Sequence, residues 1–395
     1  MNCHFLLFFL FASSFLSAQI DSPKTFLAGE RDLGRGLVVD DLSNIYILSQ
    51  ETTNERDFAR LRKLNADGEE IFSFRLTIEA GKDSHAKDIL LTSEGTLLCL
   101  FVKEQSGSVT NGEEDLVIQK FDLSGNLLSE FSEMVDPLFS AWISSIRFGE
   151  LPDGGFVIQG PALSSMGVGS REMVVAKFDA DFNLIGSMST GLTSIRQRCF
   201  AIIDDDLILT GSPATSGPKI QLLALADSSV VWEQTLDVAG ITSNFIYAPV
   251  ILPNGNGYGI VANIHSSIDS LAGIWYFNLD VDGNIQSQTV FRSPIFNFNS
   301  GAFPSIVLDY QNRINVLFSA FDADTVGVTR HLMISESGEI ECENLLDLGV
   351  GREQMRRYVN INTGQLLGVG SARDSSDMTS VVLLAAVDVD KSLME

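Results

Sequence analysis

The chain is poor in cysteine. It has four among 395 residues, and Cys3 lies in an apolar N-terminal stretch, which leaves Cys99, Cys199 and Cys342 far apart in the sequence. Three distant thiols without a C-x-x-C pair do not make a disulfide framework. Each of the three lies among apolar residues, so we expect buried, free thiols.

Basic residues are also scarce. Lys and Arg number 26 against 51 Asp and Glu, which gives a formal net charge of −25. Nucleic-acid binding needs clustered cations that neutralise phosphates, so this balance argues against a nucleic-acid partner. An acidic surface keeps a protein soluble and attracts cations, but it does not define a fold.

Long apolar runs are absent. The run from Phe5 to Leu16 is shorter than the roughly 20 residues that cross a bilayer, and no later stretch approaches that length. It has the length of a signal-peptide core, and Leu16-Ser17-Ala18 fits a cleavage site. We therefore predict a signal peptide at residues 1–18, a mature chain from about Gln19, and a secreted or periplasmic protein. The alternative is a buried strand or helix at the true N-terminus.

The chain lacks N-x-[ST] glycosylation sequons, which favours a bacterial source. It also lacks a nucleophile elbow, an HExxH motif, a phosphate loop and a Ser-His-Asp arrangement. A carboxylate pair for glycoside chemistry can always be drawn among 51 acidic residues. These absences favour a binding protein over an enzyme.

What the sequence does contain is a repeat. A strand–turn–strand phrase recurs seven times, centred on Gly68, Gly125, Phe182, Ser229, Gly283, Gly338 and Lys391, for example as KFDLSGNLL and NLDVDGNIQ. Successive copies are roughly 47 to 57 residues apart. This spacing is close to that of propeller blades, whose repeats run from about 40 to 50 residues.

A second phrase precedes each copy, for example LTSEGTLLCLFV at 91–102 and LPDGGFVIQG at 151–160. Each unit therefore contains two hairpins and four strands. Strands such as LLCLFV are apolar at almost every position, as expected of strands buried on both faces between stacked sheets. The sequence predicts an all-β, seven-bladed β-propeller of four-stranded antiparallel blades, in one domain over 19–395.

The last unit has almost no fourth strand, since the chain ends at Glu395. The segment SPKTFLAG at 22–29 reads as a short strand without a partner in its own unit. We expect this N-terminal strand to complete the last blade, beside its third strand, and so to close the ring.

The phrases DGGFVIQG and VVAKFD resemble the repeats of secreted bacterial β-propeller proteins, of the type DGG-F-x-I-x-G followed by K-F-D-x-x-G-N. The resemblance covers essentially the whole mature chain. It implies the propeller fold, but these repeats serve many functions, so it adds little about chemistry.

The Asp-rich turns admit two interpretations. Asp280-Val281-Asp282-Gly283-Asn284 and Asp179-Ala180-Asp181-Phe182-Asn183 look partly like calcium loops. Neither has the longer series of oxygen ligands and the terminal Glu of an EF-hand loop. We expect hairpin turns, in which Asp and Asn bond the local backbone, and no cofactor or metal; calcium is the alternative.

Basic residues gather where the innermost strands begin. Five of the seven units contribute to this group, which comprises Arg35, Lys87, Arg147, Arg196, Arg198, Arg356 and Arg357, with Arg352 just upstream. In a propeller these strands line the central channel, next to the long loops that join the hairpins. We predict an anion-binding site at the channel mouth formed by Arg147, Arg196, Arg198, Arg356 and Arg357. The alternative is that each arginine pairs with a neighbouring carboxylate and ties blades together.

The sequence thus favours a secreted binding or scaffolding module for an anionic ligand or glycan, with an unknown protein or glycan partner. The alternatives are a propeller enzyme, such as a polysaccharide lyase or hydrolase, and a surface adhesion component.

Overall fold

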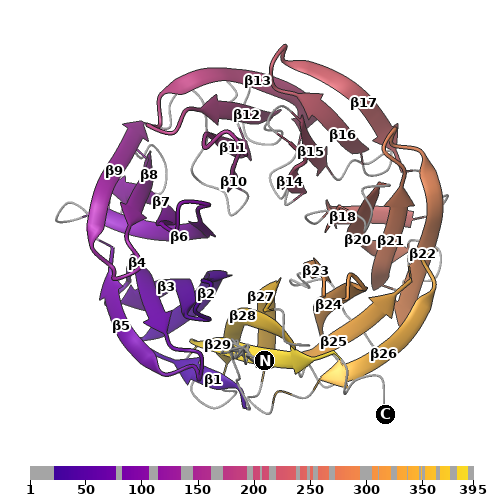
Figure 1. Ribbon diagram of the computed structural model, residues 1–395. Helices are drawn as coiled ribbons and strands as arrows, with labels where there is room; N and C mark the ends of the chain where they lie inside the picture. The colour runs from indigo at the N-terminus through magenta and orange to yellow at the C-terminus, as the bar shows by residue number, and fades with distance from the viewer. Residues whose placement is uncertain are drawn as a thin grey trace, which may run out of the picture.

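The structure is a computed structural model (Figure 1). It describes residues 22–76, 82–105, 114–134, 146–161, 172–193, 199–204, 207–212, 219–236, 241–246, 250–251, 257–266, 272–293, 305–309, 311–321, 327–335, 337–346, 348, 352–361, 365–373 and 380–389. Within these ranges the strands form seven antiparallel sheets arranged around a central axis, and no helix occurs. The predicted seven-bladed propeller is confirmed.

Each blade runs from an innermost to an outermost strand in chain order. The first three blades comprise β2 (Arg31–Val39), β3 (Ile45–Thr53), β4 (Arg56–Leu64) and β5 (Glu70–Arg75); β6 (Lys82–Leu91), β7 (Leu97–Gln105), β8 (Glu114–Phe121) and β9 (Leu127–Met134); and β10 (Arg147–Glu150), β11 (Phe156–Pro161), β12 (Glu172–Phe178) and β13 (Leu184–Thr193).

The next three blades follow the same order. They comprise β14 (Phe200–Ile202), β15 (Leu207–Ser212), β16 (Lys219–Ala224) and β17 (Ser229–Thr235); β18 (Ile241–Ile246), β20 (Tyr258–Ser266), β21 (Ala272–Leu279) and β22 (Ile285–Ser293), with β19 (Val250–Ile251) also on β20; and β23 (Ser305–Leu308), β24 (Ile314–Phe321), β25 (Gly327–Ile334) and β26 (Ile340–Leu346).

The seventh blade joins the two ends of the chain. It contains β27 (Arg352–Asn360), β28 (Gln365–Arg373) and β29 (Ser380–Asp388), and its outer strand is β1 (Lys24–Phe26). Thr25 lies opposite Leu383 in this antiparallel pair. The N-terminal strand is shorter than the predicted segment 22–29, but it pairs beside the third strand of the last unit, as expected.

The core lies between the blades. On β7, Leu97, Cys99 and Phe101 pack toward the first blade, whereas Leu98 and Leu100 pack toward the third. Because successive side chains of a strand point to opposite faces, a strand between two sheets must be apolar at every position. This explains the uninterrupted apolar runs of the middle strands.

The described cysteines are free thiols, as predicted. Cys99 and Cys199 are buried and Cys342 is partly buried. Burial raises the pKa of the Cys99 and Cys199 thiols, which therefore stay protonated and unreactive at neutral pH.

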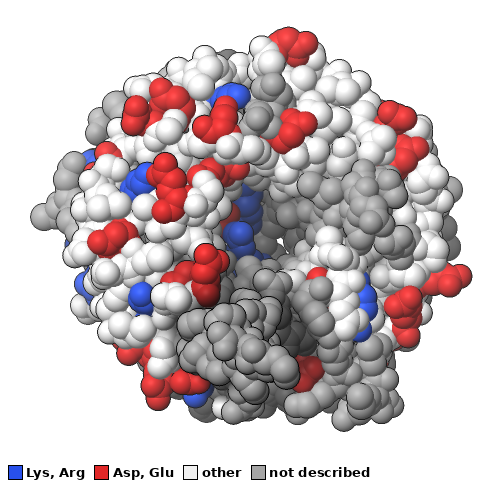
Figure 2. Space-filling view, in the orientation of Figure 1, with Lys and Arg blue, Asp and Glu red and all other residues white. Residues whose placement is uncertain are grey.

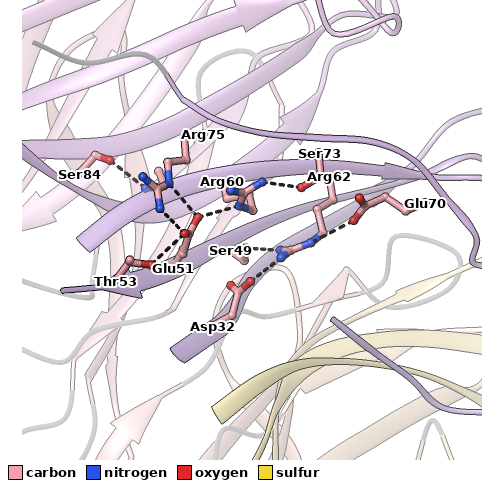
Figure 3. Close-up of polar contacts among 11 residues, drawn as sticks. Asp32, Ser49, Glu51, Thr53, Arg60, Arg62, Glu70, Ser73, Arg75 and Ser84 are labelled. Atoms are coloured by element: carbon pink, nitrogen blue, oxygen red, sulfur yellow. Dashed lines mark hydrogen bonds and ion pairs between the residues drawn. The ribbon is translucent and has the colours of Figure 1, made fainter. Parts of the chain in front are cut away.

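The first blade also buries charge (Figure 3). Arg62 on β4 is 1% exposed, and its Nη2 lies 2.5 Å from Oδ2 of Asp32, which is fully buried on β2. Its Nη1 donates to Oγ of Ser49 at 2.7 Å. The guanidinium lies 5.9 Å from the centre of the Phe26 ring, so this pair also contacts the N-terminal strand.

A second network surrounds Glu51 on β3, which is fully buried (Figure 3). Arg60 Nε lies 2.8 Å from Oε2 of Glu51, and Arg75 Nη2 lies 2.5 Å from Oε1. Burial works to raise the pKa of Glu51, but the hydrogen bonds and charges of Arg75 and Arg60 outweigh it and lower the pKa to about 2.

This network predicts a pH-dependent contribution to stability. Because the pKa of Glu51 is lower in the folded chain, its contribution is complete above about pH 4.5 and is lost as the pH falls toward 2. At pH 7 it amounts to about 3 kcal/mol. In urea titrations, Glu51→Gln should therefore be less stable than the unmodified protein at pH 7, and the difference should shrink as the pH falls. Glu94→Gln, at an exposed carboxylate, is the control. A difference independent of pH would contradict the assignment.

Candidate functional site: the central channel

The innermost strands surround one cavity of about 460 Å³ at the propeller axis. Side chains from β2, β6, β10, β14, β23 and β27 line it. Figure 2 shows Lys and Arg side chains on the wall of this central hollow, whereas Asp and Glu dominate the surrounding face. A cationic lining is unexpected in a chain with a net charge of −25, so the channel is the strongest candidate for a site.

Four arginines line the cavity: Arg35, Arg147, Arg356 and Arg357. The last three belong to the site predicted from the sequence, and Arg35 belongs to the wider basic group at the starts of the inner strands. Arg196 and Arg198, the other two predicted site residues, lie outside the described residues. Among the described residues, the arginines come from β27, β2 and β10, so they occupy one side of the channel and do not form a complete ring.

Bulges place two of these side chains. In the pairing of β2 with β3, Gly34 faces Ser49 and Gly36 faces Leu48, so Arg35 is an extra residue. Arg356 is the extra residue of β27, between Met355 and Arg357, in the same way. A bulge bends its strand and re-aims side chains, and here both bulged residues line the channel.

The same bulge occurs at Lys87 on β6, where Ala86 and Asp88 face adjacent residues of β7. Arg35, Lys87 and Arg356 each lie five positions before the hydrogen-bonded turn that ends their strand, at Asp40, Thr92 and Ile361. Three adjacent blades therefore share one basic bulge, although Lys87 does not line the cavity. Sequence reasoning found these basic residues but missed the bulge. Their constant distance from the turn is the signal that could have indicated it.

Glycines on both sides of Arg35 allow the neighbouring blades to approach. A Cβ at Gly34 would lie 2.6 Å from the carbonyl oxygen of Gly370 on β28. A Cβ at Gly36 would lie 2.8 Å from Cγ2 of Ile89 on β6. A side chain at either position would collide with the neighbouring blade. Glycine at positions 34 and 36 therefore allows β2 to pack closely between the seventh and second blades.

Arg357 is paired with a carboxylate. Its Nη1 lies 2.5 Å from Oδ1 of Asp88, and this ion pair joins the seventh blade to the second. Gly36 belongs to the blade between them, and a Cβ at Gly36 would lie 3.2 Å from Oδ1 of Asp88. The absence of a side chain at Gly36 therefore leaves room for the Arg357–Asp88 ion pair. For Arg357 the structure thus matches the alternative expectation, in which an arginine ties blades together.

Arg35 and Arg147 differ from Arg357. Within the described part of the chain, no carboxylate forms an ion pair with either, and the buried Nε of Arg35 meets no hydrogen-bond acceptor. Arg147 Nη1 donates to the carbonyl oxygen of Ile146 at 2.9 Å. These two guanidinium groups line the channel without an ion-pair partner among the described residues.

The electrostatic environment of Arg35 and Arg147 disfavours their charged forms. Burial lowers the pKa of Arg35 to about 10; Asp57 opposes this, and the charges of Arg31 and Arg147 add to it. Burial likewise lowers the pKa of Arg147, with Asp88 opposing and Arg357 adding to the effect. Arg35 stays protonated at pH 7 because its pKa near 10 is far above neutrality. Each charge is thus destabilised by its surroundings, and an anion would relieve that cost.

The acidic residues of the cavity are engaged. Asp88 is paired with Arg357. Glu150 accepts hydrogen bonds from the backbone nitrogen of Ser93, at 2.7 Å, and from its Oγ, at 3.0 Å. Glu150 therefore holds the turn between β6 and β7, and neither carboxylate forms an ion pair with Arg35 or Arg147.

The Asp-rich turns behave as hairpin turns. Oδ1 of Asp280 accepts hydrogen bonds from the backbone nitrogens of Asp282, at 3.0 Å, and Asn284, at 2.8 Å. The turn at Asp179 repeats this pattern. Calcium would have to compete with these donors for the same oxygen. Among the described residues there is no group of three or more His, Cys, Asp or Glu that could hold a metal ion.

No protein-family model matches the chain, and no curated protein is similar to it in sequence. Solved structures similar to it include the polysaccharide lyase Uly1, with 9% identity, a TM-score of 0.49, and coverage of 90% of this chain and 90% of that one. Others are the Dos1 propeller (11% identity, TM-score 0.47, 89% and 77% coverage) and a protein of unknown function from Dyadobacter fermentans (12% identity, TM-score 0.46, 78% and 99% coverage). At these values the matches carry no argument about function.

The described residues include no helix long and apolar enough to cross a membrane.

Proposed function

We propose that this propeller is a binding protein that holds an anionic ligand, carrying a carboxylate or phosphate group, in its central channel. The observation that carries the proposal is the pair Arg35 and Arg147, two guanidinium groups that line one cavity without a carboxylate partner in the described part of the chain. Low-dielectric walls strengthen the field of such charges, and guanidinium groups bind carboxylate and phosphate oxygens with charge-assisted hydrogen bonds.

Binding fits this site better than acid–base catalysis does. A glycoside hydrolase needs two carboxylates that are available to the substrate. Among the described residues the carboxylates that line this cavity are Asp88 and Glu150, and they are engaged by Arg357 and Ser93. In this proposal Arg356 adds positive charge to the cavity lining beside Arg35. Arg196 and Arg198 are candidate ligand contacts because of their positions in the sequence.

The proposal predicts that citrate binds the protein and that binding depends on the channel arginines. Removing one charge-assisted hydrogen bond typically costs about 1.5–3 kcal/mol, so Arg35→Gln and Arg147→Gln should each weaken citrate binding by about tenfold or more. Isothermal titration calorimetry at low ionic strength measures this. The matched control is Lys120→Gln, which removes one positive charge from β8, outside the cavity lining. Equal affinities in all four proteins would refute the channel site.

We also propose that the protein is exported, because residues 1–18 have the features of a signal peptide. N-terminal sequencing of the protein recovered from outside the cytoplasm should then give Gln19 as the first residue. Recovery with Phe5–Leu16 still attached would contradict export by this route.

A further inference from the structure

We infer that the ligand of the channel is an amphipathic organic anion: a carboxylate or phosphate group attached to an apolar, ring-sized body. This inference rests on the proposed function and adds the chemical class of the ligand. It follows from the unequal chemistry of the cavity walls.

The arginines of β2 and β27 face an apolar wall across the cavity, and Arg147 of β10 lies next to that wall. The arginines come from β27, β2 and β10, whereas all three residues of β14, Phe200, Ala201 and Ile202, line the cavity. Figure 1 shows β14 across the ring from β2 and β27. Ile306 of β23 and Phe148 of β10 extend the apolar lining.

The apolar wall reaches the cations at β10. A Cβ at Gly149 would lie 2.6 Å from Cδ1 of Ile202 and 3.4 Å from Cε1 of Phe200. Both side chains therefore extend over β10 at a position two residues beyond Arg147. They remain partly exposed while packing against the apolar cluster between the third and fourth blades. A single bound molecule could thus contact Arg147 with its anionic group and Phe200 and Ile202 with its body.

This arrangement favours anions with an apolar body over hydrophilic anions such as citrate, which bind through the arginines alone. A sugar acid would bring hydroxyl groups against Phe200, Ala201 and Ile202, which offer no hydrogen-bond partners from their side chains, and burying unpaired hydroxyls is costly. An apolar body would instead remove the exposed surface of these residues from water. The cavity, at about 460 Å³, lies within the range of roughly 300–1,000 Å³ typical of small-molecule sites.

Three probes that differ in one property each test the inference by calorimetry on the unmodified protein. 2-Naphthoate carries both the anion and the apolar body, glucuronate carries the anion on a hydrophilic body, and 2-naphthamide is the neutral counterpart of naphthoate. We expect 2-naphthoate to bind at least tenfold more tightly than either of the others. Phe200→Ala should weaken naphthoate binding several-fold and leave glucuronate unchanged, and Arg35→Gln should weaken the binding of both anions.

The remaining outcomes separate a failure of the amphipathic ligand from a failure of the anion site itself. Equal binding of naphthoate and glucuronate, both lost in Arg35→Gln, refutes the amphipathic ligand and leaves the proposed anion site intact. Equal binding of naphthamide and naphthoate shows that the apolar wall acts alone, and refutes both. Absence of binding by all three probes also refutes both. Since the comparison of probes needs no variant, a folding defect in Phe200→Ala does not affect it.

Discussion

Asp32→Asn is expected to lower the free energy of unfolding by about 3–5 kcal/mol, because it removes the fully buried carboxylate that pairs with the Arg62 guanidinium. Only the partly exposed Glu70, whose Oε2 lies 3.5 Å from Arg62 Nε, then remains as a counter-charge. Asparagine keeps the volume and an oxygen near Arg62 Nη2, so the change removes charge rather than packing. For a chain of this length the loss corresponds to about 4–6 °C in Tm, since the entropy of unfolding scales with the number of residues.

Replacing the arginine of this pair should lower the free energy of unfolding by less than replacing the aspartate does. In Arg62→Met the remaining Asp32 can take up a proton and become neutral, whereas a buried arginine keeps its charge. Burial already raises the pKa of Asp32 even with Arg62 beside it. The double variant Asp32→Asn/Arg62→Met should be more stable than Asp32→Asn alone. Calorimetric Tm values for the four proteins measure this cycle. A loss below about 1 kcal/mol in Asp32→Asn would mean that Glu70 or solvent compensates the Arg62 charge without Asp32.

Gly283→Ala should destabilise the protein by about 2–4 kcal/mol, through backbone strain and a collision between blades. Gly283 has φ +82°, and its added Cβ would lie 2.6 Å from the ring of Trp232 in the preceding blade. That ring is fixed, because Trp232 Nε1 donates to the carbonyl oxygen of Val281 at 3.1 Å.

Gly154 provides a matched control for this prediction. It occupies the equivalent position of a turn of the same type, with φ +83°, and nothing lies within 4 Å of an added Cβ. Gly154→Ala therefore reports only the cost of a left-handed backbone, about 1–2 kcal/mol. Urea unfolding of both variants gives the difference, which measures the inter-blade contact. Equal losses in the two variants would show that the turn does not press on Trp232.

The fold was predictable because its determinants are local. Many of the turns use the side chain of their first residue to bind the backbone, as when Oδ1 of Asp122 accepts from the nitrogens of Ser124 and Asn126. The fourth position takes a positive φ, at Gly125 as at Phe182. Such signals recur within a few residues of sequence, so seven copies indicate seven blades.

The site was only partly predictable because its geometry is not local. Arginines at the starts of inner strands can be read from the sequence, but the bulge at Arg35 depends on pairing with β3. The partner of Arg357 is Asp88, which is 269 positions away in the sequence, and no pattern in either segment predicts that contact. The same limit applies to the apolar wall, since Phe200 and Arg35 face one cavity only once the ring forms.

The most direct test of the central claim is a crystal structure of the protein soaked in tungstate, an anion whose anomalous scattering locates it without ambiguity. The account predicts a tungstate peak in the channel, within hydrogen-bonding distance of the guanidinium groups of Arg35 and Arg147, and no such peak in the Arg35→Gln/Arg147→Gln variant. A channel without tungstate, or Arg35 and Arg147 each paired with a carboxylate of the protein, would contradict it.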